Sequence, residues 1–263
     1  MSREPVEVES ASNSRLKLAR SLVSTRGIRK AGLYLLEGPR YVSDALRWSR
    51  IDFLVLSRDA TETCQTAARR AMAQGVNCIS VPPALFAEVS DTAHSQGLAA
   101  VCPLPDIDPA HLLTGRLLLA LDGVSDPGNV GTSIRSAAAL GASGVALFSG
   151  CASAFVPKST RASAGAVTAI PLAQGLDPEG FLRSARKAGW KLLVADASGK
   201  PVVPNDRRGK TLLIVGSEAH GPSEEVSRLA DLSVSIPITE RVESLNAAVS
   251  AAILLYALSR EPD

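Results

Sequence analysis

Short apolar runs alternate with helical stretches through the second half of this 263-residue chain. Five such runs follow residue 115, and their sequences are LLLALDG, GVALFS, WKLLVAD, TLLIVG and LSVSIP. Short apolar runs bounded by turn residues are typical of buried strands. A regular alternation of strands and helices is typical of a parallel sheet covered by helices. The pattern therefore predicts an α/β fold with a parallel sheet for this half of the chain.

A smaller α/β domain is predicted for the first half. LYLLEG, FLVLS and NCISV are strand-like runs, and YVSDALRWS and TCQTAARRAMAQG are helical stretches between them. The two halves are separated by VCPLPDIDPAHLLTG, which has three prolines and little periodicity and is therefore typical of a linker. We expect one domain over residues 1–105, a linker over residues 106–114 and a second domain over residues 115–263.

Composition and spacing argue against several classes of protein. No apolar run approaches the ~20 residues that a membrane span needs, and MSREPVEVES lacks the apolar core of a signal peptide. The three histidines are scattered, and the four cysteines show no CxxC or other ligand spacing. We therefore expect no metal site, reduced cysteines and a cytoplasmic location.

Positive charge is concentrated near the N-terminus. Residues 13–50 carry nine Lys/Arg and two Asp/Glu, a local excess of +7 in a chain whose net charge is +2. Such a segment suits contacts with phosphates, although a solvated charged helix face would have the same composition. Few aromatic residues accompany the charges, so stacking on unpaired bases is not strongly indicated.

A strand, a loop, a second strand and a helix with a polar start follow one another near the C-terminus. Leu212–Val215 is a buried-strand run, and Gly216 begins a loop with room for a ligand near the backbone. Val234–Ile236 is the second strand, which Pro237 stops, and Ser244 is a suitable N-cap for the helix. Ligands of α/β sheets bind at the carboxyl ends of strands. The stretch therefore predicts a ligand site, although an ordinary strand–helix unit has the same spacing.

A second polar segment follows the run LLLALDGV. Pro127 to Asn129 is expected to form a turn, after which a helix begins at Gly131 or Thr132 and includes Arg135. A cation in the first turn of a helix opposes the helix dipole. Arg135 is therefore expected to face an anion such as a phosphate, unless it is an ordinary surface arginine. No G-x-G-x-x-G follows any strand, so the usual dinucleotide-binding turn is not indicated.

Three segments resemble, in the right order, the motifs of the SpoU/TrmH class of RNA ribose methyltransferases in the SPOUT superfamily. They are LDGVSDPGNVGTSIRSAAALGASGV, GSEAHG and SIPITERVESLNAAVS. SNSRLKLARSLVSTRGIRKAGLYLLEGPRYVSDAL and QGLAAV are similar to the family's N-terminal RNA-binding domain. The resemblance covers nearly the whole chain and is weakest in the middle of the N-terminal half. Ala219 and Glu240 stand where glycine is common, and Glu240 puts in doubt the shape of the loop that covers the cofactor.

The resemblance carries expectations about fold and function. It implies a parallel-sheet SPOUT domain with a C-terminal trefoil knot, preceded by a small α/β RNA-binding domain, and a homodimer. It implies methyl transfer from S-adenosylmethionine to a ribose 2′-hydroxyl of RNA. An added N-terminal domain is commoner among the family's ribosomal-RNA enzymes, which favours large-subunit (23S) ribosomal RNA. The alternatives are a tRNA ribose methyltransferase, a SPOUT enzyme that methylates a base nitrogen, and a non-catalytic ribosome-binding protein.

The resemblance also assigns roles to residues by motif position. The expected cofactor contacts are Gly216, Ile236 and Leu245, and the expected catalytic residues are Asn129, Arg135, Glu218, Ser244 and Asn246. The expected RNA contacts are Arg15, Lys17, Arg20, Arg26, Arg29, Lys30 and Arg40. Free guanidinium is a very poor base, so we expect Arg135 to anchor a phosphate and help to activate the hydroxyl. Glu218 is the alternative base. Without the resemblance, Ile236 and Leu245 would be interpreted as core residues, and Glu218 as an exposed charge.

Overall fold

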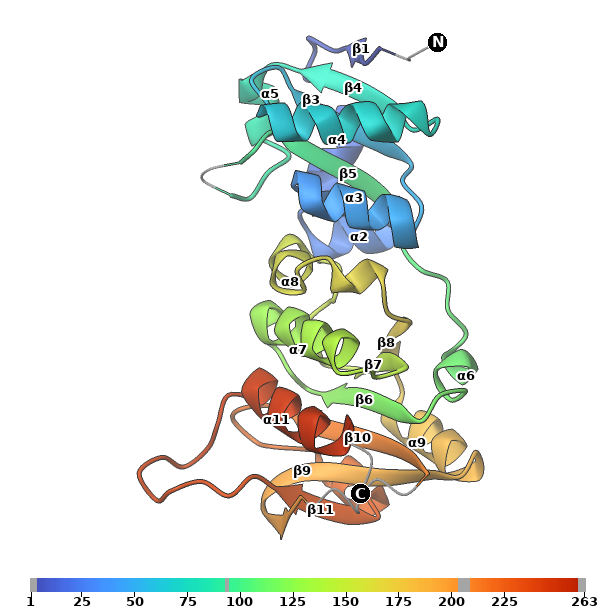
Figure 1. The fold of residues 1–263 in the computed structure, drawn as a ribbon, viewed down its shortest axis with the longest axis vertical. Coiled ribbons are helices and arrows are strands. Elements are labelled where there is room, and N and C mark those ends of the chain that lie inside the picture. The colour runs from blue at the N-terminus through green and yellow to red at the C-terminus, as the bar shows by residue number, and fades with distance from the viewer. Residues whose placement is uncertain (1–3, 93–94, 203–208, 260–263) are drawn as a thin grey trace. The chain divides into compact units, whose positions relative to one another are not determined.

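The computed structural model describes residues 4–92, 95–202 and 209–259, and the chain divides into two compact units (Figure 1). The first unit comprises Met1–Leu104 and Phe155–Ala169, and the second comprises Pro105–Ala154 and Ile170–Asp263. Each unit is built around its own sheet. Within the described part of the chain, no helix has both the length and the apolar character that a membrane crossing requires.

The first unit contains a five-stranded mixed sheet with the order β1-β4-β3-β5-β2. Strands β1, β4 and β3 run parallel, whereas β5 is antiparallel to both β3 and β2. The strands are β1 (Val6–Glu7), β2 (Leu33–Glu37), β3 (Phe53–Ser57), β4 (Asn77–Val81) and β5 (Leu98–Pro103). The helices are α1 (Ser14–Ser21), α2 (Thr25–Ala31), α3 (Pro39–Trp48), α4 (Glu62–Ala73) and α5 (Pro83–Ala87). The three strands predicted for this half are confirmed, whereas the two-residue β1 was not expected.

Side-chain caps define the first two helices. The Oδ1 atom of Asn13 accepts hydrogen bonds from the amides of Arg15 and Leu16, at 3.0 and 3.3 Å, and α1 begins there. The hydroxyl of Ser24 accepts from the amide of Gly27 at 3.1 Å and starts α2. Asn and Ser favour this position because their short polar side chains satisfy amides that have no partner inside the helix. The basic residues of this segment are therefore carried on two short, capped helices.

A segment distant in sequence completes the first unit. It contains α8 (Pro157–Ala162) and a 3-10 turn, η1 (Ala166–Thr168). The buried ring of Phe155 lies 4.8 Å from that of Tyr34, measured between centroids. Arg161 forms an ion pair with Asp91, in which Nη2 lies 3.0 Å from Oδ2. The core of the first unit thus includes residues from Phe155–Ala169, a segment that lies in the sequence between two parts of the second unit.

The second unit contains a six-stranded, entirely parallel sheet with the order β11-β9-β10-β6-β7-β8. The strands are β6 (Leu117–Asp122), β7 (Gly144–Phe148), β8 (Leu172–Leu176), β9 (Trp190–Pro201), β10 (Lys210–Gly216) and β11 (Leu232–Ser235). All five predicted runs are strands, which confirms the parallel sheet. Strand β8 was not predicted, because only its first two residues are buried and the rest carries no apolar pattern.

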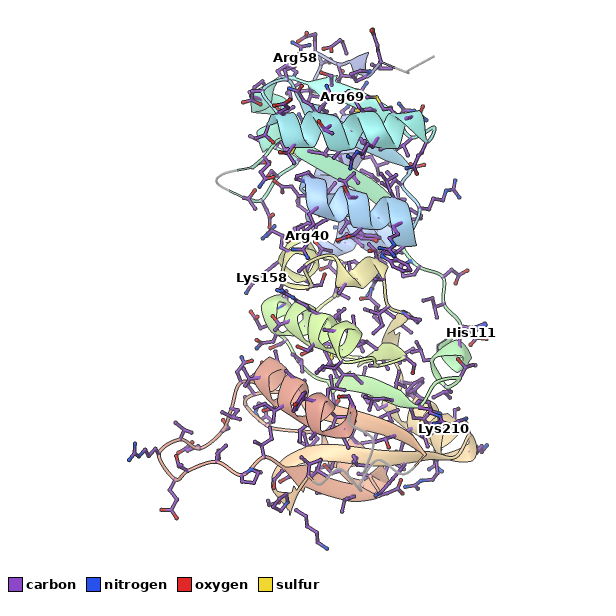
Figure 2. The ribbon with its side chains drawn as sticks, viewed as in Figure 1. Arg40, Arg58, Arg69, His111, Lys158 and Lys210 are labelled. Atoms are coloured by element: carbon purple, nitrogen blue, oxygen red, sulfur yellow. The ribbon has the colours of Figure 1, made fainter. Side chains whose placement is uncertain are left out.

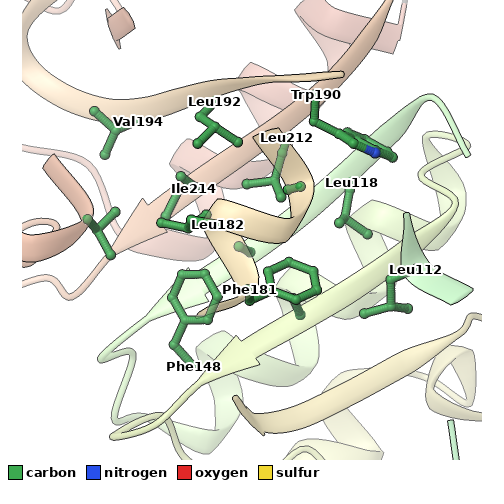
Figure 3. Close-up of a cluster of buried hydrophobic side chains, with 14 of the residues drawn as sticks. Leu112, Leu118, Phe148, Phe181, Leu182, Trp190, Leu192, Val194, Leu212 and Ile214 are labelled. Carbon is green, nitrogen blue, oxygen red and sulfur yellow. The ribbon is translucent and has the colours of Figure 1, made fainter. Parts of the chain in front are cut away.

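Helices cover both faces of this sheet, which explains the buried apolar runs of β6, β7 and β10. They are α6 (Pro109–Leu112), α7 (Pro127–Ala139), α9 (Pro178–Lys187), α10 (Glu224–Leu229) and α11 (Ala247–Ser259). Leu118 and Leu212 pack with Phe181 of α9 in one cluster (Figure 3). Because strand side chains alternate between faces, Leu119 and Leu213 lie on the opposite face, where α7 and α11 contact β6 and β10.

The proline-rich stretch at residues 101–115 is partly structured. Its first three residues belong to β5, and its middle forms the single turn of α6. Leu112 in that turn is fully buried and belongs to the cluster of the second unit. The stretch therefore begins in the sheet of the first unit and, at Leu112, contributes a side chain to the core of the second unit.

Candidate functional site

Three segments that are far apart in sequence meet beside the ends of two neighbouring strands. β6 and β10 are parallel, and Asp122 lies opposite Gly216 in register. The carboxyl ends of parallel strands lie at one edge of the sheet, so the loops toward Asn129 and Glu218 leave the same edge. Helix α11 packs against α7, and this contact brings Asn246 to the same place.

A chain of hydrogen bonds connects one residue from each segment. The side-chain amide of Asn129 donates through Nδ2 to Oε1 of Glu218. The amide of Asn246 donates through Nδ2 to Oδ1 of Asn129 at 3.0 Å. Asn129 therefore uses both ends of its amide, one as a donor and the other as an acceptor. Asn246 thus makes a hydrogen bond across the site, from the start of α11 to the start of α7.

Helix α7 begins earlier than expected. Pro127 is its first residue, and Oδ1 of Asp126 caps it by accepting from the amide of Asn129 at 3.0 Å. The expected turn and the expected start at Gly131 or Thr132 were wrong, because proline suits the first position of a helix as well as a turn. Arg135 consequently lies in the third turn of α7, and the argument from the helix dipole does not apply to it.

Arg135 is exposed on α7, and its side chain makes no hydrogen bond or ion pair with any other described residue. It is six positions beyond Asn129, which places it about 9 Å further along the helix axis. The structure therefore brings Asn129, Glu218 and Asn246 together but leaves Arg135 outside this network.

The cap of α11 also differs from expectation. Oδ1 of Asn246 accepts from the amides of Ala248 and Val249, at 2.9 and 3.3 Å. Asn246, rather than Ser244, is thus the N-cap, and the assignment of Ser244 as the cap was wrong. Both residue types are good caps, so composition alone did not distinguish them. Ser244 is instead an exposed residue of the loop that precedes the helix.

The loop that carries Glu218 is closed by its own backbone. Ser217 and Gly221 exchange two backbone hydrogen bonds, at 3.0 and 2.9 Å, and Gly221 has a φ of +66°. A Cβ atom at position 216 would lie 2.1 Å from the backbone of Gly221 and Pro222. The close approach that requires glycine at 216 is therefore made by the protein's own loop.

Asp122 is a structural member of the site that the sequence did not reveal. Its side chain is 7% exposed, and Oδ2 accepts from the amide of Ser223 at 2.7 Å. A buried carboxylate needs such a partner. This bond fixes the far end of the Glu218 loop to the end of β6. The available signal was a charged residue at the end of the apolar run LLLALD.

A cavity of about 600 Å³ adjoins this loop. All three predicted cofactor residues, Gly216, Ile236 and Leu245, line it, together with Glu218 and Ser244. Its volume falls within the roughly 300–1,000 Å³ that is typical of small-molecule sites. Asn129, Asn246 and Arg135 are not among the lining residues.

The cavity combines an apolar wall with negative charge. The larger apolar side chains are Val215, Val234, Ile236, Ile238, Val242, Leu245 and Leu254, and the carboxylates are Asp196, Glu218, Glu240 and Glu243. The hydroxyl and amide of Ser198 both donate to Asp196, and they hold its pKa below the usual value. Asp196 therefore stays ionised at neutral pH. These walls fit S-adenosylmethionine, which has an aromatic base, an ammonium group and a positively charged sulfonium.

The predicted RNA contacts fall into two groups. Lys17, Arg26, Arg29, Lys30 and Arg40 are exposed, and Figure 2 labels Arg40 on α3. Arg20 forms an ion pair with Glu88 at 3.1 Å, and the guanidinium of Arg15 lies 5.6 Å from the centroid of the Phe53 ring. The side chains of Arg15 and Arg20 thus have partners within the protein. Among the described residues, no group of three or more His, Cys, Asp or Glu could hold a metal ion.

Comparison with known families gives two matches. The family described as SpoU rRNA Methylase matches residues 116–256, and the MRM3-like substrate binding domain matches residues 13–100. The 23S rRNA (guanosine(2553)-2′-O)-methyltransferase RlmP of Bacillus subtilis is 33% identical over 253 residues, which cover 96% of this chain and 98% of that protein.

Solved structures agree with these matches. The SpoU methyltransferase AviRb from Streptomyces viridochromogenes, in complex with AdoMet, has a TM-score of 0.83 and 28% identity, covering 94% of this chain and 97% of that chain. An AdoMet-bound rRNA methyltransferase from Sinorhizobium meliloti has a TM-score of 0.81 and 30% identity, covering 95% and 96%.

The cap assignment makes a prediction about stability. Asn246→Ala should lower the free energy of unfolding by about 1 kcal/mol, because two amides at the start of α11 lose their acceptor. Asn246→Asp should keep the cap, because a carboxylate also accepts from these amides, and should lose only the hydrogen bond that Nδ2 donates to Asn129. Denaturant unfolding measures both. Ser244→Ala is the matched control and should have little effect; a larger loss for Ser244→Ala than for Asn246→Ala would contradict the assignment.

Proposed function

The chain belongs to the SpoU rRNA methylase family, and we propose that this S-adenosylmethionine-dependent RNA ribose 2′-O-methyltransferase acts on large-subunit (23S) ribosomal RNA. The observation that supports the reaction most directly is the meeting of the three motif segments beside one cavity. The choice of RNA rests on the relative from Bacillus subtilis, whose named substrate is 23S rRNA and which aligns over nearly the full length of both chains. We also propose a cytoplasmic location, because this relative is a bacterial protein whose named substrate is ribosomal RNA.

We assign binding of the cofactor to the cavity beside the Glu218 loop. Ile236 and Leu245 supply apolar walls, and the loop after Gly216 supplies backbone groups. The carboxylates of Asp196 and Glu218 line this cavity and favour a ligand with positive charge. When bound, S-adenosylmethionine supplies a methyl group on a sulfonium, which is activated for attack by an oxygen nucleophile.

The protein's main contribution is to orient the ribose. A hydroxyl oxygen that is held in line with the methyl group reacts in an effectively unimolecular step, which is faster than a bimolecular encounter in solution. Asn129 restrains the carboxylate of Glu218, and Asn246 restrains Asn129, so all three polar groups are held in place before RNA arrives. Glu218 is the residue of this network that can accept the proton of the 2′-hydroxyl.

We assign to Arg135 the binding of an RNA phosphate, and not the removal of the proton from the 2′-hydroxyl. It is exposed and has no partner among the described residues, so its guanidinium can form a two-pronged contact with a phosphate. Such a contact would fix the nucleotide beside the network.

RNA binding is assigned to the N-terminal part of the chain. We keep residues 1–105 as the RNA-binding domain and residues 115–263 as the methyltransferase domain, with residues 106–114 between them. The match to a substrate binding domain over residues 13–100 and the exposed cations on α1, α2 and α3 support this. Phosphate contacts release counterions, so the affinity for RNA should fall steeply with salt.

We further propose that the chain forms a homodimer through the outer face of α11. Val249, Ile253 and Tyr256 lie at helical spacing on this face and are 45%, 40% and 54% exposed. The opposite face of α11 is already buried in the second unit. An apolar helix with one uncovered apolar stripe is expected to bury that stripe against a partner. We also propose that the methyltransferase domain has the C-terminal trefoil knot that the resemblance implies.

The reaction is tested by incubating the full-length protein with unmodified 23S rRNA and S-adenosylmethionine labelled in its methyl group. Label should enter RNA at a ribose, and digestion should release a nuclease-resistant dinucleotide. Label on a base would instead indicate a nitrogen methyltransferase. Transfer to tRNA but not to 23S rRNA would overturn the choice of RNA.

The role of Arg135 gives a second prediction. Arg135→Ala should lower single-turnover methyl transfer by at least ~100-fold, the scale of losing a group that positions the reacting nucleotide, and should leave cofactor binding intact. Arg135→Lys should restore only part of the rate, because a point charge cannot form a two-pronged contact. Arg228→Ala removes another exposed helical arginine of the same unit and serves as the control. Near-normal transfer by Arg135→Ala would remove this residue from the mechanism.

The proposed interface gives a third prediction. Ile253→Glu places a charge in the apolar stripe of α11 and should convert the dimer to monomer in sedimentation experiments. Val23→Glu places the same charge at a residue that is 41% exposed in the first unit and should leave the dimer unchanged. A wild-type protein that sediments as a fully active monomer would refute the interface.

A further inference from the structure

An exposed tryptophan stands apart from the other aromatic residues of the chain. The chain has ten aromatic residues, of which seven are buried, one is half-buried, and two, Trp48 and Tyr256, are exposed. Tyr256 belongs to the proposed dimer face, whereas Trp48 ends α3 in the first unit with 53% of its surface exposed. Leaving an indole in water forgoes the burial that stabilises the other rings. An exposed indole is therefore a candidate binding surface.

The indole of Trp48 is already arranged for stacking. The guanidinium carbon of Arg47 lies 4.5 Å from the centroid of its ring. Arg47 therefore covers one face of the indole and places a positive charge beside it. A nucleobase can stack on a ring that is held in this way, and the adjacent guanidinium complements the phosphate that accompanies the base.

A polar cavity of about 420 Å³ is lined in part by Ser49, the residue that follows Trp48 in the chain. It is formed where α3 leads into β3 and α4 leads into β4, and its lining includes Arg50, Asp52, Gln74 and Asn77. All four side chains are exposed, and none of the four is hydrogen-bonded to another described residue. Together they offer amide and guanidinium donors as well as amide and carboxylate acceptors, which are the groups that read the edge of an unpaired base.

From these observations we propose that Trp48, Arg47 and this cavity form a site for an unpaired nucleotide of the RNA substrate. The base stacks on Trp48, its edge faces Gln74 and Asn77, and Arg47 and Arg50 face the phosphates. The proposal rests on the proposed function for the kind of RNA, and the site lies wholly within the first unit. It adds a base-stacking element that the basic composition of residues 13–50 did not indicate.

The test uses the full-length protein and a single-stranded RNA of roughly ten nucleotides. Because Trp190 is buried, RNA that stacks on Trp48 should quench the exposed part of the tryptophan emission. Trp48→Leu should weaken binding roughly 5- to 150-fold, the range for loss of one stacked base, while Trp48→Phe should retain most of the affinity. Asn77→Ala should weaken binding less and change the preference between adenosine and uridine oligonucleotides.

Two controls separate this site from other effects. Val6→Ala truncates an exposed apolar residue of the first unit outside residues 13–50 and should bind RNA like the wild type. Affinity for S-adenosylmethionine, measured by calorimetry, should be unchanged in Trp48→Leu. Equal RNA affinity of Trp48→Leu and wild type would overturn the proposal. The wild-type protein could fail to methylate ribosomal RNA while Trp48→Leu still binds RNA more weakly than the wild type. That result would overturn the proposed function and support the nucleotide site.

Discussion

Asn129 joins three distant segments of the chain through the two ends of one side-chain amide. It donates to Glu218 and accepts from Asn246, and its backbone amide is held by the cap of α7. Because an amide has one donor end and one acceptor end, the two partners fix its orientation completely. Asn129 therefore helps to fix the position of the Glu218 carboxylate and of Asn246 at the start of α11.

Backbone packing around the same strands determines the rest of the site. Gly216 admits the returning backbone of Gly221 and Pro222, which no side chain at 216 would allow. Asp122 then fixes the end of this loop through the amide of Ser223. The loop is thus held at both ends before any ligand arrives, and a preorganised loop lowers the entropic cost of binding.

Much of the fold could be read from the sequence, because parallel strands buried on both faces leave long apolar runs such as LLLALD and TLLIVG. The predicted cofactor residues also line one cavity. The predictions were wrong where one residue type suits two local structures. Pro127 fits either a turn or the start of a helix, and Ser244 and Asn246 are both good caps. The packing of Phe155 on Tyr34 and the role of Asp122 depend on contacts between distant segments, which local patterns do not encode.

The central claim is that the cavity beside the Glu218 loop holds S-adenosylmethionine through the chain's own residues. Calorimetric titration of the full-length protein, without added metal, tests it most directly. We expect saturable binding by the wild type and its loss in Gly216→Ala, because the added methyl would displace the backbone at Gly221 and Pro222. Circular dichroism would establish that both proteins are folded. A folded wild-type protein that shows no binding, or a Gly216→Ala variant that binds equally well, would contradict the account.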